Sequence, residues 1–310
     1  MKKKAVFLAT NERFVFAVGT LLLSLKKTSP KTVENCDILI YVQDVSDKSK
    51  EILNKILPCK FTEYKFAVDT DFDDINFKNF SQLTFARYEI FDLLNTYEKV
   101  LYMDADIMIG KELYPVFDYG ESGLAMAKDV QKGLNLITKN FVEPVPGYDM
   151  TVPNFNAGVT LFTNKLPKIN ELKMYCYHKT AAMLKNLVCP DQGVINLMMQ
   201  DYNIKTETMN PMFNCLVSLP QYFDKKHNDV YVYHCAGGGL RFWGYTYFKM
   251  WEEYYQQWLS LGGQAHREPQ SGWYKFVKKH GLYKYSFFDR CPNPVMHPAR
   301  FLKYVFLKGW

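Results

Sequence analysis

The sequence lacks the cysteine patterns that are typical of disulfide-stabilised domains and of zinc sites. Its seven cysteines are odd in number and scattered, and no two of them are spaced Cys-x-x-Cys. This pattern argues against a disulfide framework and against a structural zinc site, and it suits a reducing cytosol. An internal repeat and a low-complexity tract are also missing.

A hydrophobic run long enough to span a bilayer is lacking as well. The uncharged stretch 14–25 is too short for a transmembrane helix. The basic start, Met1 to Lys4, is similar to that of a signal peptide, but the apolar run behind it stops at Asn11. That run is too short for the hydrophobic region of a signal peptide. We therefore expect a cytoplasmic protein.

Net positive charge is lacking outside the last part of the chain. Residues 264–310 contain nine Lys and Arg but two acidic residues, so this segment carries the whole net charge of +6. It is also rich in aromatic residues. Within 297–310, a helix would place Phe301 and Phe306 on one face and Lys303 on the other. We expect this segment to bind the anionic inner face of the cytoplasmic membrane rather than nucleic acid. Alternatively, its aromatic side chains fold back onto the rest of the protein.

The remaining sequence predicts alternating strands and helices, and hence an α/β fold with a mostly parallel central sheet flanked by helices. The Gly262–Gly263 pair ends the last helix of this pattern. We place a domain boundary there, with a catalytic domain at 1–263 and a basic, aromatic, helical tail at 264–310. The expected strands are 4–9, 37–42, 61–66, 99–104, 123–128, 155–163 and 231–234, and the expected helices are 16–26, 48–57, 81–94, 168–187, 191–200 and 248–261.

The most informative segment is Lys99 to Asp106, in which an apolar run ends in two carboxylates, Asp104 and Asp106. Ligands of open α/β sheets bind at the carboxyl ends of strands. Two carboxylates there can hold a divalent cation against phosphate oxygens. Alternatively, one aspartate caps a turn and the other pairs with a lysine. A third interpretation is a phosphatase of the haloacid-dehalogenase type, but the Ile107-Met108-Ile109 that follows lacks the hydroxyl residue which that family uses.

Six segments, in one order, resemble the retaining glycosyltransferases of family 8, a group with the GT-A fold that includes glycogenin and bacterial lipooligosaccharide α-galactosyltransferases. The resemblance runs from about Ala5 to Trp243. The segments are Ala9-Thr10-Asn11-Glu12-Arg13-Phe14, Phe85-Ala86-Arg87-Tyr88, Lys99 to Asp106, Phe155-Asn156-Ala157-Gly158, Pro190-Asp191-Gln192-Gly193 and His234-Cys235-Ala236-Gly237.

The resemblance implies a role for the residues of each segment. Ala9, Thr10, Asn11 and Phe14 would contact the uridine, with Phe14 stacking on the base. Arg87 and Ala105 would lie on the nucleotide side of the site. Asn156 and Ala157 would face the donor sugar, and Gly237 the phosphates. Asp104, Asp106 and His234 would hold Mn²⁺ or Mg²⁺. Asp191, Gln192 and Asp129 would act near the anomeric carbon. Arg241 stands in place of the family's phosphate-binding Lys, with one extra residue before it.

The resemblance further implies transfer of a hexose, galactose or glucose, from a UDP-sugar to a glycan acceptor with retained anomeric configuration. Lipopolysaccharide or lipooligosaccharide synthesis is the expected setting. Gln192 is a weak nucleophile, so we expect same-face attack, with Gln192 and Asp191 stabilising an oxocarbenium-like state. Two other hypotheses stay open here, a metal-dependent phosphatase and a non-catalytic, nucleotide-binding membrane adaptor.

Overall fold

A seven-stranded sheet with the strand order β3-β2-β1-β4-β7-β6-β8 forms the centre of the molecule. The computed structural model describes residues 2–70, 72, 81–130, 135–217, 229–236, 241–244 and 248–280. The strands of this sheet are β1 Lys4–Asn11, β2 Cys36–Gln43, β3 Cys59–Glu63, β4 Lys99–Met103, β6 Leu124–Lys128, β7 Phe155–Thr163 and β8 Thr206–Thr208. Four of its six strand pairs are parallel, and β7 runs antiparallel to both of its neighbours. The predicted α/β fold with a mostly parallel central sheet is confirmed.

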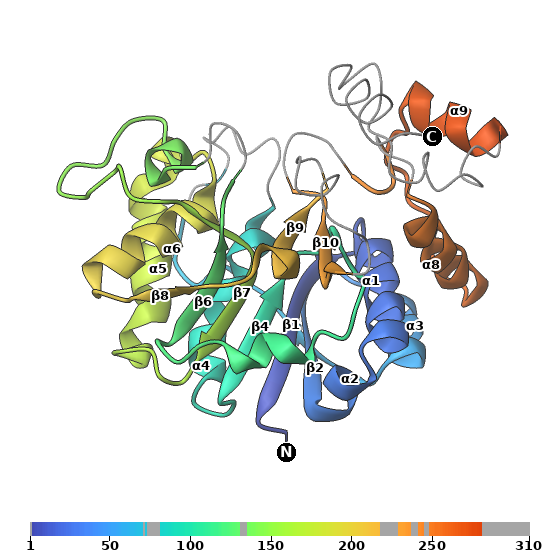
Figure 1. Cartoon of the computed structure of the whole chain (residues 1–310), viewed down its shortest axis with the longest axis horizontal. Coiled ribbons are helices and arrows are strands. Elements are labelled where there is room, and N and C mark those ends of the chain that lie inside the picture. Colours follow the sequence, from blue (N-terminus) through green and yellow to red (C-terminus); the bar gives the residue numbers. More distant parts are fainter. Residues whose placement is uncertain are drawn as a thin grey trace.

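Helices cover both faces of this sheet, with α1 and α3 on one side and α5 and α6 on the other (Figure 1). Alternate residues of β1 belong to different hydrophobic clusters, Val6 and Leu8 to one and Ala5 and Phe7 to the other. This is the pattern of a strand that is buried on both faces. The α-helices are α1 Val15–Thr28, α2 Pro30–Asn35, α3 Asp47–Ile56, α4 Ile90–Leu93, α5 Ile169–Met183, α6 Pro190–Asp201, α8 Lys249–Ser260 and α9 Gly272–His280. None of the helices in the described ranges is both long and apolar enough to cross a membrane.

The strand order places a topological switch point between β1 and β4. The chain leaves β1 for β2 and β3 on one side, and β4 then lies on the other side of β1, parallel to it. In open α/β sheets the ligand crevice lies at such a point, outside the carboxyl ends of the strands. The loop after β1 and the two aspartates after β4 therefore reach the same edge of the sheet.

A second, three-stranded sheet was not predicted. It has the order β5-β10-β9 and consists of β5 Ile107–Ile109, β9 Cys215–Leu216 and β10 Val232–His234. β10 lies within the predicted strand 231–234, whereas β5 was not predicted, because three apolar residues give no periodicity.

The predicted helix at 81–94 is only partly present. The segment Gln82–Glu89 forms the 3₁₀ helix η1, and the short helix α4 follows it. In a 3₁₀ helix, side chains three residues apart are eclipsed. Thr84 and Arg87 therefore lie on one face, and both contact the carboxylate of Asp191. The tighter winding is thus tied to the position of a candidate site residue.

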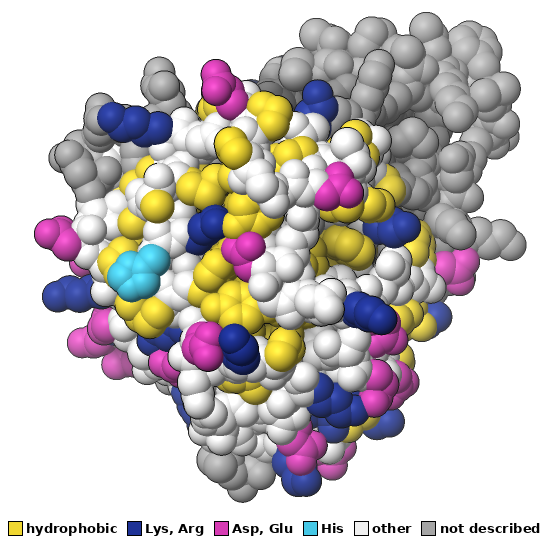
Figure 2. Space-filling model, turned by 90° about the vertical axis from the view of Figure 1, so that its left-hand side faces the viewer, with side chains coloured by type: hydrophobic (Ala, Val, Ile, Leu, Met, Phe, Trp, Pro, Cys, Tyr) yellow, Lys and Arg dark blue, Asp and Glu magenta, His cyan; other side chains and the backbone are white. Residues whose placement is uncertain are grey.

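The face that carries α5 and α6 is shown in Figure 2, where hydrophobic side chains gather near the centre between charged groups. Near the start of α6, two short segments bind each other through their backbones. Val142 N donates to Asn186 O at 2.8 Å, and Val188 N donates to Asn140 O at 2.7 Å. This pairing fixes the chain just before Asp191.

The segment that follows α8 packs back onto α8, which itself packs against α1. The Trp258 side chain of α8 lies against Gly19 of α1, where an added Cβ would be 2.2 Å from Cε3. From α9, the Tyr274 hydroxyl and the Lys278 ammonium donate to the carboxylate of Glu252 at 2.8 Å and 2.7 Å. The expected amphipathic helix at 297–310 lies outside the described residues.

Candidate active site

The three predicted metal ligands converge beyond the carboxyl end of β4. One possible ligand atom from each of Asp104, Asp106 and His234 lies within 4.8 Å of the other two. His234 Nε2 is 3.3 Å from Asp106 Oδ1 and 3.6 Å from Asp104 Oδ2. The imidazole is buried, and among the described residues its Nε2 has no hydrogen-bond partner. A buried nitrogen that faces two carboxylates is a suitable ligand set for a divalent cation.

The second sheet brings His234 to the aspartates. Strand β5 begins directly after Asp106, and in the antiparallel pair β5–β10 the residue opposite Ile107 is His234. The backbone N–H of Cys235 donates to the Asp106 carbonyl at 3.0 Å and extends this pairing by one residue. The ligands are therefore held by backbone pairing between segments that are far apart in the sequence.

Gly158 of β7 keeps the space between these ligands open. An added Cβ at this position would be 2.2 Å from His234 Cε1 and 2.7 Å from Asp104 Oδ2. The Asp104 N–H donates to the Gly158 carbonyl at 2.9 Å, so the strand cannot simply move away. Together with the unpartnered Nε2, this cradle fits a cation bound by Asp104, Asp106 and His234.

Arg87 bridges the metal triad and the start of α6. Its guanidinium is buried and lies 3.0 Å from an Asp104 oxygen and 2.7 Å from an Asp191 oxygen. Burial alone would raise the pKa of Asp104, but Arg87 and His234 hold that pKa below its usual value. For Asp191 the balance is reversed, because burial raises its pKa more than Arg87 lowers it. The two carboxylates that share Arg87 therefore have pKa values shifted in opposite directions.

A second group of predicted residues meets beside the triad. Gln192 Nε2 donates to Asp129 Oδ2 at 3.3 Å, and Gln192 Oε1 accepts the Ala157 N–H at 3.1 Å. Asn156 Nδ2 donates to the same Asp129 oxygen at 3.1 Å. All of these side chains are buried. The structure thus brings together the residues for which the resemblance implied contact with the donor sugar.

The end of β1 and the loop after it hold the residues predicted for the uridine. Asn11 Oδ1 accepts the backbone N–H of Phe14 at 3.2 Å, a local turn that sets the direction of Phe14. The Phe14 ring lies 6.2 Å from that of Trp243. Thr10 is buried, whereas Ala9, Asn11, Phe14 and, on the facing strand end, Ala105 are half-buried. This partial exposure leaves surface for a ligand.

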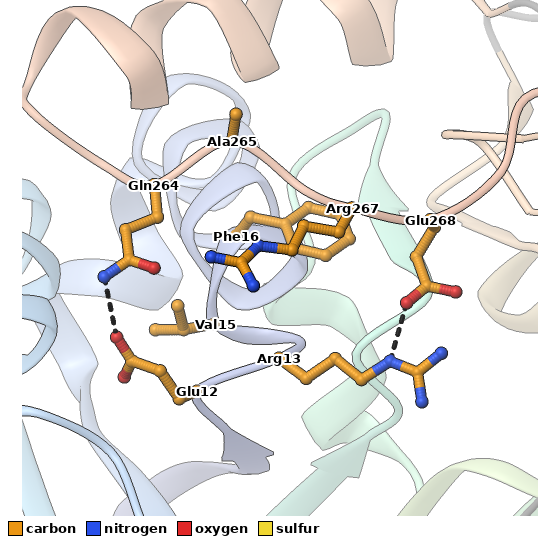
Figure 3. Close-up of a pocket in the computed structure, with 8 residues that line it drawn as sticks. All are labelled: Glu12, Arg13, Val15, Phe16, Gln264, Ala265, Arg267 and Glu268. Atoms are coloured by element: carbon orange, nitrogen blue, oxygen red, sulfur yellow. Dashed lines mark hydrogen bonds and ion pairs between the residues drawn. The ribbon is translucent and has the colours of Figure 1, made fainter.

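A pocket of about 430 Å³ opens beside this loop (Figure 3). Its walls come from the start of α1 and from the segment after α8. Gln264 Nε2 donates to Glu12 at 3.1 Å, and Arg13 Nε donates to Glu268 at 2.6 Å. The pocket is lined by Glu12, Arg13, Val15, Phe16, Gln264, Ala265, Arg267 and Glu268.

Arg241 also reaches the triad. Its guanidinium forms an ion pair with Asp106 and donates to the Cys235 carbonyl at 2.8 Å. Burial lowers the pKa of Arg241, against the attraction of Asp104 and Glu268. The guanidinium therefore lies beside the three predicted metal ligands. The predicted phosphate contact Gly237 lies outside the described residues.

Sequence reasoning missed some members of the site. Tyr102 donates to Asp104 at 2.7 Å, and Asn214 Oδ1 lies 2.7 Å from His234 Nδ1. Tyr102 could have been predicted as a neighbour of Asp104, because the two residues are two apart on a predicted strand and such residues lie on the same face. Asn214 is the last residue of the short 3₁₀ helix Pro211–Asn214 and carries no pattern that points to His234.

Comparisons with known proteins agree with this arrangement. The model of the family "Glycosyl transferase family 8" matches residues 5–246. Two proteins of Streptococcus pneumoniae serotype 4 are similar, glycosyltransferase GlyE with 26% identity over 64% of this chain and glycosyltransferase GlyD with 25% identity over 64%. The matches span 45% of GlyE and 23% of GlyD, so the chain covers half or less of these relatives.

Solved structures with the same fold include galactosyltransferase LgtC in complex with donor and acceptor sugar analogues. It is 16% identical, with a TM-score of 0.61 over 83% of this chain and 99% of that one. The crystal structure of GlyE is 21% identical, with a TM-score of 0.57 over 86% of this chain and 66% of that one. At these identities the likeness shows the fold, which confirms the predicted GT-A architecture.

Proposed function

Because this chain belongs to glycosyl transferase family 8 and is a glycosyltransferase, we propose that it is a retaining enzyme that moves galactose or glucose from a UDP-sugar to a glycan acceptor. The observation that supports this most directly is the triad of Asp104, Asp106 and His234, with the unpartnered Nε2 directed at two carboxylates. Family membership leaves the phosphatase alternative without support.

We propose that Asp104, Asp106 and His234 bind Mn²⁺ or Mg²⁺, which would neutralise the diphosphate and stabilise UDP as the leaving group. Arg241 would donate to the same phosphate oxygens, since guanidinium groups bind phosphate well. Phe14 would stack on the uracil, and Asn11 and Ala9 would line the base and ribose. The pocket between Arg13 and Glu268 adjoins this loop and would lie on the nucleoside side.

In the transfer step, the bond between the anomeric carbon and the β-phosphate oxygen breaks, the acceptor hydroxyl oxygen bonds to the same carbon, and the hydroxyl proton passes to the departing phosphate oxygen. Both ends of the Gln192 amide are engaged by protein groups, Oε1 by Ala157 N–H and Nε2 by Asp129. This arrangement disfavours Gln192 as a nucleophile and favours same-face attack. Gln192 and Asp191 would then stabilise positive charge at the sugar ring.

We predict that Gln192→Ala lowers kcat about 10- to 100-fold and changes the Kd of the donor less than threefold, because the interaction strengthens with charge in the transition state. Steady-state kinetics and calorimetry on the same donor separate the two effects. Product NMR should show the retained anomeric configuration. An inverted product would contradict the mechanism, and a parallel loss of donor affinity would place Gln192 in ground-state binding.

A donor screen tests the proposed function as a whole. The protein is incubated with Mn²⁺ and a panel of UDP-, GDP- and ADP-hexoses, and nucleotide release is measured with and without simple sugar acceptors. We expect release of UDP from UDP-galactose or UDP-glucose, with an increase when an acceptor is present. Release of phosphate from unrelated esters would favour a phosphatase, and binding of UDP without any turnover would favour a non-catalytic adaptor.

We further propose a setting in lipopolysaccharide or lipooligosaccharide synthesis, with residues 1–263 as the catalytic domain and the tail at 264–310 held on an anionic inner membrane face. The charge of the tail supports this proposal. Because residues up to Lys278 contact α8, the informative truncation removes 281–310. This variant should keep activity on a free sugar acceptor and lose sedimentation with anionic vesicles. Unchanged sedimentation would contradict membrane binding through the tail.

A further inference from the structure

A chain of hydrogen bonds runs from Asp129 to His234 through two asparagines. Asn156 Nδ2 donates to Asp129 Oδ2 at 3.1 Å, and Asn214 Nδ2 donates to Asn156 Oδ1 at 2.8 Å. Asn214 Oδ1 then lies 2.7 Å from His234 Nδ1. Each of these four residues is at most 5% exposed, so competition from bulk water at these contacts is small.

The direction of this chain is fixed at Asn156. The Gly158 backbone N–H donates to Asn156 Oδ1 at 3.0 Å, and a backbone N–H can only donate. On the other side, the Asp129 Oδ2 atom accepts from the Asn156 amide nitrogen. Asn156 therefore presents its oxygen to Gly158 and Asn214, and its amide nitrogen to Asp129.

The orientation of Asn156 determines that of Asn214. Asn214 must direct Nδ2 toward the Asn156 oxygen, which leaves its own Oδ1 facing His234 Nδ1. A neutral imidazole carries one N–H, on either Nδ1 or Nε2. If the proton were on Nε2, two acceptor atoms would face each other at 2.7 Å. The N–H is therefore on Nδ1, and Nε2 carries a free lone pair.

We infer that Asn214 is a positioning residue that fixes the tautomer and ring orientation of His234, so that the Nε2 lone pair faces Asp104 and Asp106. The inference rests on the proposed function only in that His234 is taken as a metal ligand. Outer partners of metal-binding histidines set the tautomer in this way, usually through a carboxylate or a backbone carbonyl. Here a side-chain amide, oriented through Asn156, takes that role.

Binding of Mn²⁺ alone, followed by the electron paramagnetic resonance signal of free Mn²⁺, tests the inference. Asn214→Leu keeps similar volume and removes the acceptor, so Mn²⁺ affinity should fall about 10- to 100-fold. Thr180→Val is the matched control, because it removes a buried hydrogen bond to Tyr88 away from the triad. It should bind Mn²⁺ like the wild type. Equal Mn²⁺ affinity in Asn214→Leu and wild type would overturn the inference.

A second measurement does not depend on whether Asn214→Leu folds. Long-range ¹H–¹⁵N NMR of the wild-type protein at alkaline pH, where imidazoles are neutral, reads the tautomer of each histidine. The His234 signals are assigned by their loss in His234→Gln. We expect Nδ1–H for His234, and an Nε2–H tautomer would overturn the inference. If Mn²⁺ bound equally well to the wild type and to His234→Gln, or to neither, the metal part of the proposed function would fail. The tautomer of His234 would still decide this inference.

Discussion

Gly158→Ala should lower Mn²⁺ affinity by more than about 100-fold while the protein stays folded. The added methyl group would lie 2.2 Å from His234 Cε1 and 2.9 Å from its Nε2, far inside van der Waals contact. The imidazole would have to leave its position, and one of the three ligands would be lost. Such overpacking typically costs about 1–3 kcal/mol of stability, which a folded domain can tolerate.

Mn²⁺ titration and thermal unfolding of the same variant separate these effects. Gly272→Ala is the control, because nothing lies within 4 Å of the Cβ that it adds. It should match the wild type in both measurements. If Gly158→Ala bound Mn²⁺ as tightly as Gly272→Ala, the triad would not be the metal site.

Arg87→Leu should lower the free energy of unfolding by about 3–5 kcal/mol, the usual cost of removing one partner from a buried ion pair. Arg87 is 2% exposed and contacts two carboxylates, Asp104 and Asp191. Without the guanidinium, the buried Asp191 and the partly exposed Asp104 would lie near each other with no cation between them. Burial already raises the pKa of Asp191.

Urea denaturation measures this loss, and Lys173→Met provides the matched control. Lys173 also bridges two carboxylates, Glu89 and Asp92, but the Asp92 side chain is 59% exposed. Pairs that reach solvent contribute about 1 kcal/mol or less. Equal destabilisation in the two variants would show that the burial of the Arg87 bridge does not matter.

The sequence predicted where the site lies in the fold better than it predicted the local structure that positions the site residues. An apolar run that ends in Asp104 and Asp106 predicts a buried strand with ligands at its carboxyl end, and β4 confirms the strand. The position of Arg87 was predicted on a regular helix, whereas the 3₁₀ winding of η1 depends on a contact with Asp191 more than a hundred residues later. Local propensity contains no information on such a contact.

The second sheet and Asn214 could not be predicted for related reasons. The predicted strand 231–234 contains β10, but β5 has three residues, which is too short for a periodic pattern, so the pairing of β5 with β10 could not be predicted. Their pairing is nonetheless what places His234 beside Asp106. The role of Asn214 depends on the orientation of side-chain amides that lie far apart in the chain. A single asparagine is common in turns, so Asn214 alone does not indicate such a role.

The metal dependence of donor turnover tests the central claim most directly. UDP release from the donor selected in the screen is measured in wild type and in Asp106→Asn, first with EDTA and then with increasing Mn²⁺. We expect no turnover of wild type in EDTA, saturable recovery with Mn²⁺, and no recovery in Asp106→Asn at the same Mn²⁺ concentrations. Near-normal turnover of the wild-type protein in EDTA, or normal Mn²⁺ activation of Asp106→Asn, would contradict a metal-held diphosphate at this site.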